Sequence, residues 1–139
     1  MVIYLNMTDN KIIDNKKREI NTTALAYLGD SIYEVYVREY ILNTFSQNVD
    51  EMHKKAIKFV SAEGQHIAIK KMLEEEFLSG EEISLVRRAK NRKIYSKPKN
   101  VDTMTYKLAT AFEALIGYLY LNGKKERCEE VVNYSINAL

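Results

Sequence analysis

The chain has 139 residues, of which 46% are apolar types and 29% are charged. This length accommodates one domain with its own core, and the composition is typical of a globular protein rather than of a disordered or collagen-like one. The formal net charge of +2 is nearly neutral, so a preference for a charged partner has to come from the distribution of the charges.

Cysteine usage and hydropathy bear on the cellular location. The single cysteine, Cys128, has no partner for an intramolecular disulfide, which favours a reducing, cytoplasmic setting. The N-terminal sequence lacks the charged start and apolar run of a secretory signal, and no run of about 18 apolar residues occurs. We therefore expect a protein that is neither exported nor membrane-spanning.

The hydrophobic period changes near residue 21. Residues 1–20 show no sustained period, and we interpret them as an N-terminal arm that precedes a catalytic domain over residues 21–139. Beyond the arm, apolar residues recur at steps of three and four. This pattern predicts a long helix with its N-cap among residues 21–23 and its end near Asn43.

Further helical patterns fill the rest of the chain, and no segment alternates as a strand does. We therefore expect an all-α bundle of about six helices. The pattern predicts a second helix that starts after residues 46–48, a third from a cap at Ser61 toward Phe77, a fourth opened by a capping box of Ser79 and Glu82, a fifth from Thr103 to Asn122 and Gly123, and a last one that holds Cys128 and Ile136.

The charge is concentrated in one segment. Between Ile83 and Val101 there are seven basic residues and no acidic ones, which leaves 14 basic against 19 acidic residues elsewhere. Such asymmetry suits a polyanion, and the other interpretation is a solvated charged face. We predict that this segment grips an RNA backbone, and the candidate RNA-binding residues are Arg88, Lys90, Arg92, Lys93, Lys97, Lys99 and Asn100.

Two carboxylates lie within the most apolar helical patterns. Asp30 follows Gly29 in the first, and Glu113 precedes Gly117 in the fifth. Glycine permits helices to approach closely, and two acids that face each other there would form a hard oxygen site suited to Mg²⁺. The other interpretation of each acid is a solvent-facing residue or a salt-bridge partner, for Asp30 with Arg38.

Both acids lie in recognisable motifs. Residues 24–32, which read ALAYLGDSI, resemble the signature helix of the ribonuclease III family, and residues 111–117, which read AFEALIG, resemble its second acidic motif. Together with residues 52–55, 60–62 and 97–100, they are most similar to Mini-ribonuclease III, the short bacterial subfamily with a catalytic domain and no appended domain for double-stranded RNA. The resemblance covers about residues 21–135.

The match has two departures from the wider family. That family carries a glutamate seven residues before the aspartate, where this chain has Thr23, and an aspartate three residues before the glutamate, where it has Thr110. The resemblance therefore carries over only Asp30 and Glu113, as metal ligands and catalytic residues. The reduced set agrees with the Mini-ribonuclease III subfamily.

The resemblance implies a function and an assembly. It implies a homodimer with one Mg²⁺-dependent site in each subunit, which cuts opposite strands of an RNA duplex and matures the paired ends of 23S precursor rRNA. Two alternatives remain at this stage. One is a catalytically silent RNA-binding protein that has lost too many acids, and the other is a helical adaptor that binds protein.

Overall fold

The computed structural model describes residues 20–139 and consists of six α-helices, with no strand in that range. The predicted arm over residues 1–20 lies almost entirely outside the described residues. The helices are α2 (Thr22–Thr44), α3 (Val49–Val60), α4 (Ala62–Glu74), α5 (Gly80–Lys90), α6 (Thr103–Leu121) and α7 (Lys125–Ala138). The all-α prediction is confirmed.

The polar residues that precede the helices determine where they begin. The Asn21 side chain accepts a hydrogen bond of 2.7 Å from the backbone N–H of Thr23, and Asn21 is thus the N-cap of α2. Ser79 and Glu82 form the predicted capping box at α5. Ser61 ends α3 and also caps α4, so the chain changes direction there without a loop.

The C-terminal end of α4 differs from the prediction. The helix stops at Glu74 rather than continuing toward Phe77. Glu76 adopts a positive φ of 55°, and the N–H of Phe77 returns to the carbonyl of Met72, as at a helix end of the Schellman type. The apolar pattern continues across this turn because Phe77 packs against the core and stacks on Tyr134.

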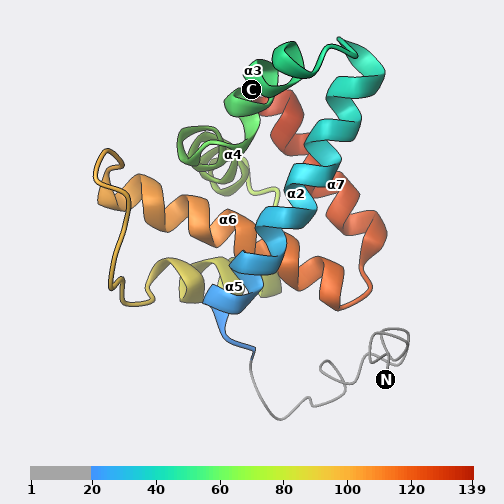
Figure 1. Cartoon of the computed structure of the whole chain (residues 1–139). Coiled ribbons are helices and arrows are strands. Elements are labelled where there is room, and N and C mark those ends of the chain that lie inside the picture. Colours follow the sequence, from blue (N-terminus) through green and yellow to red (C-terminus); the bar gives the residue numbers. More distant parts are fainter. Residues whose placement is uncertain (1–19) are drawn as a thin grey trace, which may run out of the picture.

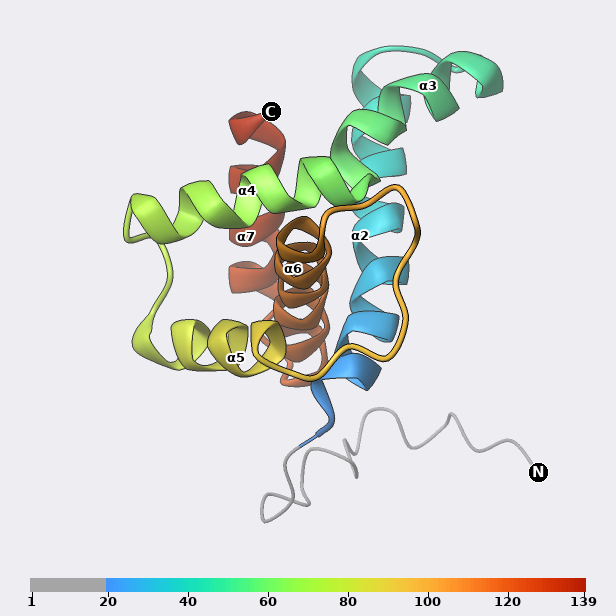
Figure 2. The same cartoon turned by 90° about the vertical axis from the view of Figure 1, so that its left-hand side faces the viewer.

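Helix α6 is the centre of the bundle. In Figure 2 it is seen nearly end-on, with α2, α4, α5 and α7 around it, and Figure 1 shows α2 crossing in front of it. Phe112, Leu115 and Leu119 on α6 are fully buried, and Phe112 meets Tyr33 of α2 edge to face. Burial on several sides explains why α6 has the most apolar sequence of the helices.

Glycines allow α2 and α6 to cross with their backbones in contact. A Cβ atom added to Gly29 would lie 1.7 Å from the backbone oxygen of Glu113, and one added to Gly117 would lie 2.1 Å from that of Leu25. Neither position has room for a side chain. Asp30 directly follows Gly29, and the backbone of Glu113 is itself part of the contact, so the crossing places the two acids beside each other.

None of the helices in residues 20–139 combines the length and the apolar character that a bilayer crossing requires.

Candidate active site and basic loop

The structure brings the two predicted acids together from different helices. Asp30 lies on α2 and is exposed, whereas Glu113 on α6 is only partly accessible. The two carboxyl groups are close enough to share a hydrogen bond. Although Asp30 lies within an apolar helical pattern, the crossing at Gly29 leaves it facing solvent, as in the other interpretation of this acid, but next to Glu113. One carboxyl of the pair is therefore open to a ligand from outside.

Gln65 is a third member of the site that sequence reasoning missed. It lies on α4 with 2% of its surface exposed, and its Nε2 donates to the Val60 carbonyl at 3.3 Å and to Glu113 Oε2 at 3.5 Å. A fully buried amide needs such partners. The sequence signal for Gln65 was a polar residue on a helix with an apolar face, between Gly64 and His66. Its partner, Glu113, is revealed only by the packing of α4 on α6.

Burial and charge act on Glu113 in the same direction. Desolvation, and then the hydrogen bond and the negative charge of Asp30, raise the pKa of Glu113 from 4.5 to about 8, while the hydrogen bond from Gln65 opposes the rise. A partly buried carboxylate beside a second acid is costly to ionise unless a cation compensates for the charge. The pair therefore has the electrostatics of a cation site.

This pKa shift makes stability depend on pH. Folded Glu113 keeps its proton up to about pH 8, whereas the unfolded chain loses it near 4.5, so the stabilisation is complete at low pH and is lost as pH rises through 8. We expect the free energy of unfolding in EDTA to fall between pH 5.5 and 8.5, by at most about 1.4 kcal/mol per pH unit. Urea titrations of wild type and Glu113→Gln measure it. Equal pH slopes for the two proteins would contradict the raised pKa.

The alternative salt bridge of Asp30 with Arg38 is not formed. Arg38 pairs instead with Glu34, one turn away on α2, with Nη2 and Oε1 3.0 Å apart. Glu34 is thus engaged on the helix surface, while Asp30 has Glu113 as its neighbour. In the part of the chain described here, no cluster of three or more His, Cys, Asp or Glu side chains could hold a metal. The candidate site consists of two carboxylates and the Gln65 amide.

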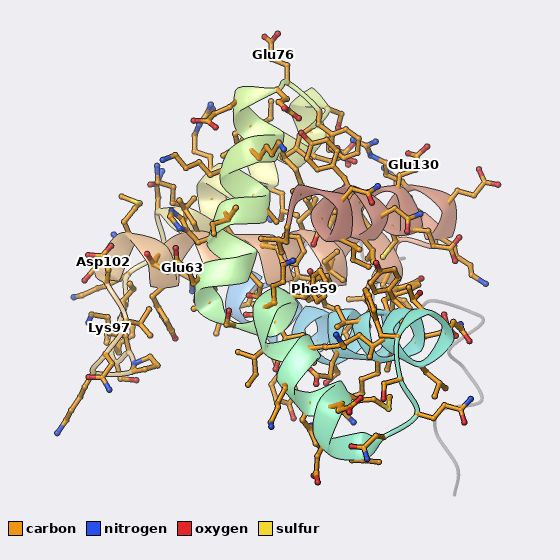
Figure 3. The ribbon with its side chains drawn as sticks, turned by 90° about the horizontal axis from the view of Figure 1, so that it is seen from above. Phe59, Glu63, Glu76, Lys97, Asp102 and Glu130 are labelled. Atoms are coloured by element: carbon orange, nitrogen blue, oxygen red, sulfur yellow. The ribbon has the colours of Figure 1, made fainter. Side chains whose placement is uncertain are left out.

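The predicted RNA-binding residues lie on the end of α5 and on the loop over residues 91–102, which we call the basic loop. Figure 2 shows this loop passing from α5 alongside α2 before it enters α6, and Figure 3 shows Lys97 near the outer edge of the molecule. The predicted residues are exposed except for Lys90, which is half-buried. Lys97 Nζ also donates to the Val101 carbonyl at 2.8 Å and so braces the loop.

A pocket of about 220 Å³ lies beneath the basic loop. Thr23 of α2 and Thr110 of α6 both line it, together with Arg92 and Lys93 of the loop and Lys107 of α6. The two threonines stand where the wider family pattern has acids, and both line this one pocket. Lys107 lies outside the predicted basic segment, and only the fold brings it to this pocket.

Comparisons with known proteins agree with this architecture. The profile of the family described as "Ribonuclease III domain" matches residues 23–124. A Mini-ribonuclease 3 of Enterococcus faecalis is 41% identical over 119 residues, which cover 86% of this chain and 90% of that protein. The chain belongs to the ribonuclease III family. A Mini-ribonuclease 3 of Staphylococcus aureus is 37% identical, with coverage of 86% of this chain and 90% of that one.

Solved structures lead to the same conclusion about the fold. The crystal structure of a protein from Fusobacterium nucleatum has a TM-score of 0.75 to this structure at 36% identity, and the match covers 86% of this chain and 94% of that chain. Membership of the ribonuclease III family confirms the predicted fold and the predicted enzyme class, an endoribonuclease that acts on double-stranded RNA. The roles of the individual residues remain predictions.

Proposed function

We propose that this ribonuclease III family member hydrolyses phosphodiester bonds of RNA duplexes at a magnesium site formed by Asp30 and Glu113. The observation that carries this proposal is the contact between the two carboxyl groups at the crossing of α2 and α6, which raises the pKa of Glu113 through desolvation and through Asp30. The substrate class follows from the family, and the basic loop suits a polyanion.

The residues present fit Mg²⁺. This ion takes oxygen ligands, and proteins usually hold it by one or two carboxylates while water and substrate phosphates complete its shell. Asp30 and Glu113 supply two carboxylates, one of which is exposed. The small donor set of this chain therefore suits Mg²⁺ better than a metal that requires a cage of protein ligands. Bound there, Mg²⁺ would supply a nucleophilic water and neutralise charge on the leaving oxygen.

The chain itself contributes position and charge. The backbone contact at Gly29 fixes the separation of α2 and α6, and hence of the two carboxyl groups. Gln65 donates to Glu113 Oε2 and so restrains the orientation of that carboxylate. Because Glu113 holds its proton up to about pH 8 in the absence of a cation, cation binding at neutral pH has to release this proton.

The test uses RNA in two forms. The wild-type protein is incubated with a long RNA duplex and with the single strand, each with Mg²⁺ or with EDTA, and the products are resolved on denaturing gels. We expect cleavage of the duplex alone, and only with Mg²⁺. Binding without cleavage would favour the catalytically silent RNA-binding protein, the second candidate that the threonines at positions 23 and 110 suggest. A protein that neither binds nor cleaves RNA would favour the helical adaptor.

The basic loop is predicted to provide affinity that does not depend on RNA sequence. Reversing the charge of both Lys97 and Lys99 to Glu should weaken duplex binding by about tenfold or more and should flatten its dependence on salt, because fewer counterions are released. Fluorescence anisotropy at several salt concentrations measures both quantities. The matched control is Lys70→Glu with Lys71→Glu, on α4. An unchanged salt slope in the loop variant would contradict this role.

We further propose that the RNA duplex is the paired ends of 23S precursor rRNA, and that the protein acts in the cytoplasm. The similarity to Mini-ribonuclease 3 proteins supports the first statement. The single cysteine, which is buried and free, agrees with a reducing compartment.

We also propose a homodimer, which the family resemblance implies and exposed apolar side chains on neighbouring elements support. On α2, α3 and their connection, five large apolar side chains are between 48% and 64% exposed, namely Val35, Leu42, Phe45, Val49 and Ile57. An interface between subunits would cover apolar side chains of this kind.

Val35→Glu is therefore expected to convert the dimer into monomers, because it would place a charge within the contact between subunits. Sedimentation velocity at micromolar concentration measures the state of assembly. The control is Tyr120→Glu, which changes a side chain that is 47% exposed near the far end of α6. A wild-type protein that sediments strictly as a monomer would contradict the proposed dimer.

A further inference from the structure

The pocket beneath the basic loop has the charge of an anion site. Arg92, Lys93 and Lys107 line it, and no acidic side chain does. Within residues 20–139, the side chains of Arg92 and Lys107 have neither a hydrogen bond nor an ion pair, and Lys93 lies over the ring of Tyr95 at 5.5 Å. A hollow with three cations and low-dielectric walls concentrates a positive potential. The complementary group is an anion.

The Thr110 hydroxyl in this pocket can accept a hydrogen bond from a ligand but has no free hydrogen to donate to it. Thr110 Oγ1 donates its only hydrogen to the carbonyl of Tyr106 at 2.9 Å, so its remaining capacity is that of an acceptor. A phosphate oxygen has no hydrogen to give, whereas a ribose 2′-hydroxyl has one. Thr110 thus fits the sugar of a ribonucleotide whose phosphate is bound by the cations.

The pocket lies next to the acid pair. Thr110 and Glu113 are three residues apart on the same face of α6, which is a rise of about 4.5 Å, and Thr23 is two turns before Asp30 on α2. An RNA strand whose scissile phosphate lies at the acids would pass this pocket within one or two nucleotides.

We propose that the pocket binds one ribonucleotide of the strand that is cut, within two positions of the scissile phosphate. Lys107, with Arg92 and Lys93, binds its phosphate, and its 2′-hydroxyl donates to Thr110 Oγ1. Lys107 is the principal cation because it is fixed on α6, whereas Arg92 and Lys93 belong to the loop. This inference rests on the proposed function, since it takes a duplex cut at the acid pair as the ligand.

The first experiment removes one phosphate charge at a time. Each duplex carries a single uncharged methylphosphonate linkage, placed after a 2′-deoxynucleotide for chemical stability, and its reference carries the same deoxynucleotide with an ordinary phosphate. Affinity is measured in EDTA by anisotropy. We expect one position near the cut at which the wild type loses about tenfold in affinity, as for a charge-assisted hydrogen bond. Lys107→Ala should bind the unmodified duplex about tenfold more weakly than the wild type does. A methylphosphonate at that position should then weaken the binding of this variant little further.

The second experiment tests the sugar contact. A single 2′-deoxynucleotide at the position found above should weaken wild-type binding by about threefold to tenfold. Thr110→Val, which keeps the shape of the side chain, should be insensitive to it, whereas Thr110→Ser should keep the discrimination. Because Thr110→Ser keeps the hydroxyl, retained discrimination in this variant shows that the position tolerates substitution and that the effect of Thr110→Val comes from the lost hydroxyl. Lys125→Ala, at the start of α7, is the control for a lost surface charge and should behave as the wild type.

The outcomes distinguish a failure of the pocket from a failure of the proposed function. If the methylphosphonate penalties are the same in wild type and Lys107→Ala at every position, the pocket does not bind a phosphate and the inference is overturned. If Thr110→Val discriminates against the deoxynucleotide as the wild type does, the sugar contact is overturned. A wild-type protein that neither binds nor cuts the duplex would instead refute the proposed function.

Discussion

Glu113→Gln and Asp30→Asn are each expected to abolish cleavage of duplex RNA while leaving the duplex bound. Each change keeps the shape of the side chain but removes a negative oxygen from the proposed magnesium site. Charge stabilisation by a metal ion contributes several kcal/mol to a transition state, so the rate should fall by about three orders of magnitude. Single-turnover cleavage with excess protein measures this loss, and anisotropy in EDTA measures the retained affinity.

Two comparisons make the result of these substitutions specific. Glu74→Gln makes the same chemical change at an exposed position at the end of α4 and should cut at the wild-type rate. Glu113→Gln should also fold at least as stably as the wild type above pH 8, since it removes a partly buried charge next to Asp30. Cleavage at an undiminished rate by Glu113→Gln or by Asp30→Asn would exclude the substituted acid as a ligand.

Gly29→Ala is expected to have the largest effect on stability. Its Cβ would lie 1.7 Å from the backbone oxygen of Glu113 and 2.9 Å from the backbone nitrogen of Gly117, and neither atom can move without shifting α6. Alanine gains about 1 kcal/mol in helix propensity, but overpacking of this kind costs about 3 kcal/mol or more. We expect a net loss of roughly 2 kcal/mol or more, measured by urea unfolding, with a parallel loss of cleavage in the protein that remains folded.

Gly80→Ala is the matched control for this substitution. Gly80 begins α5, and a Cβ added there meets no atom within 4 Å. Alanine should therefore be neutral or slightly stabilising at this position. If Gly29→Ala were as stable as Gly80→Ala, the backbone contact between α2 and α6 would be absent from the protein in solution.

The amino-acid sequence by itself determined the helices and most of their ends. Periodic apolar residues, together with short polar side chains at Asn21, Ser61 and Ser79, are local signals, and the caps form where those signals predict them. The end of α4 was predicted too late because Phe77 continues the apolar pattern through a turn. Apolar periodicity reports burial, and burial continues where the helix does not.

The sequence also identified the two acids and the basic segment, since both are visible as residue types in an unusual context. It left open whether Asp30 and Glu113 meet, because they are separated by 82 intervening residues. The crossing of α2 and α6 at Gly29 and Gly117 decided that question. It also decided that Asp30 is exposed and that Glu113 carries the raised pKa.

Other members of the site depend on the tertiary structure alone. Gln65 and Lys107 carry no motif, and Thr110 was visible only as a departure from the family pattern. Their importance comes from neighbours on other elements, which are Glu113 for Gln65 and the basic loop for Lys107 and Thr110. Helix propensity and caps are properties of residues close in the sequence, whereas desolvation, charge coupling and the walls of a pocket arise between distant segments. The sequence thus determined which chemical groups this protein has, and the packing of α6 against α2, α4 and the basic loop decided which of them act together.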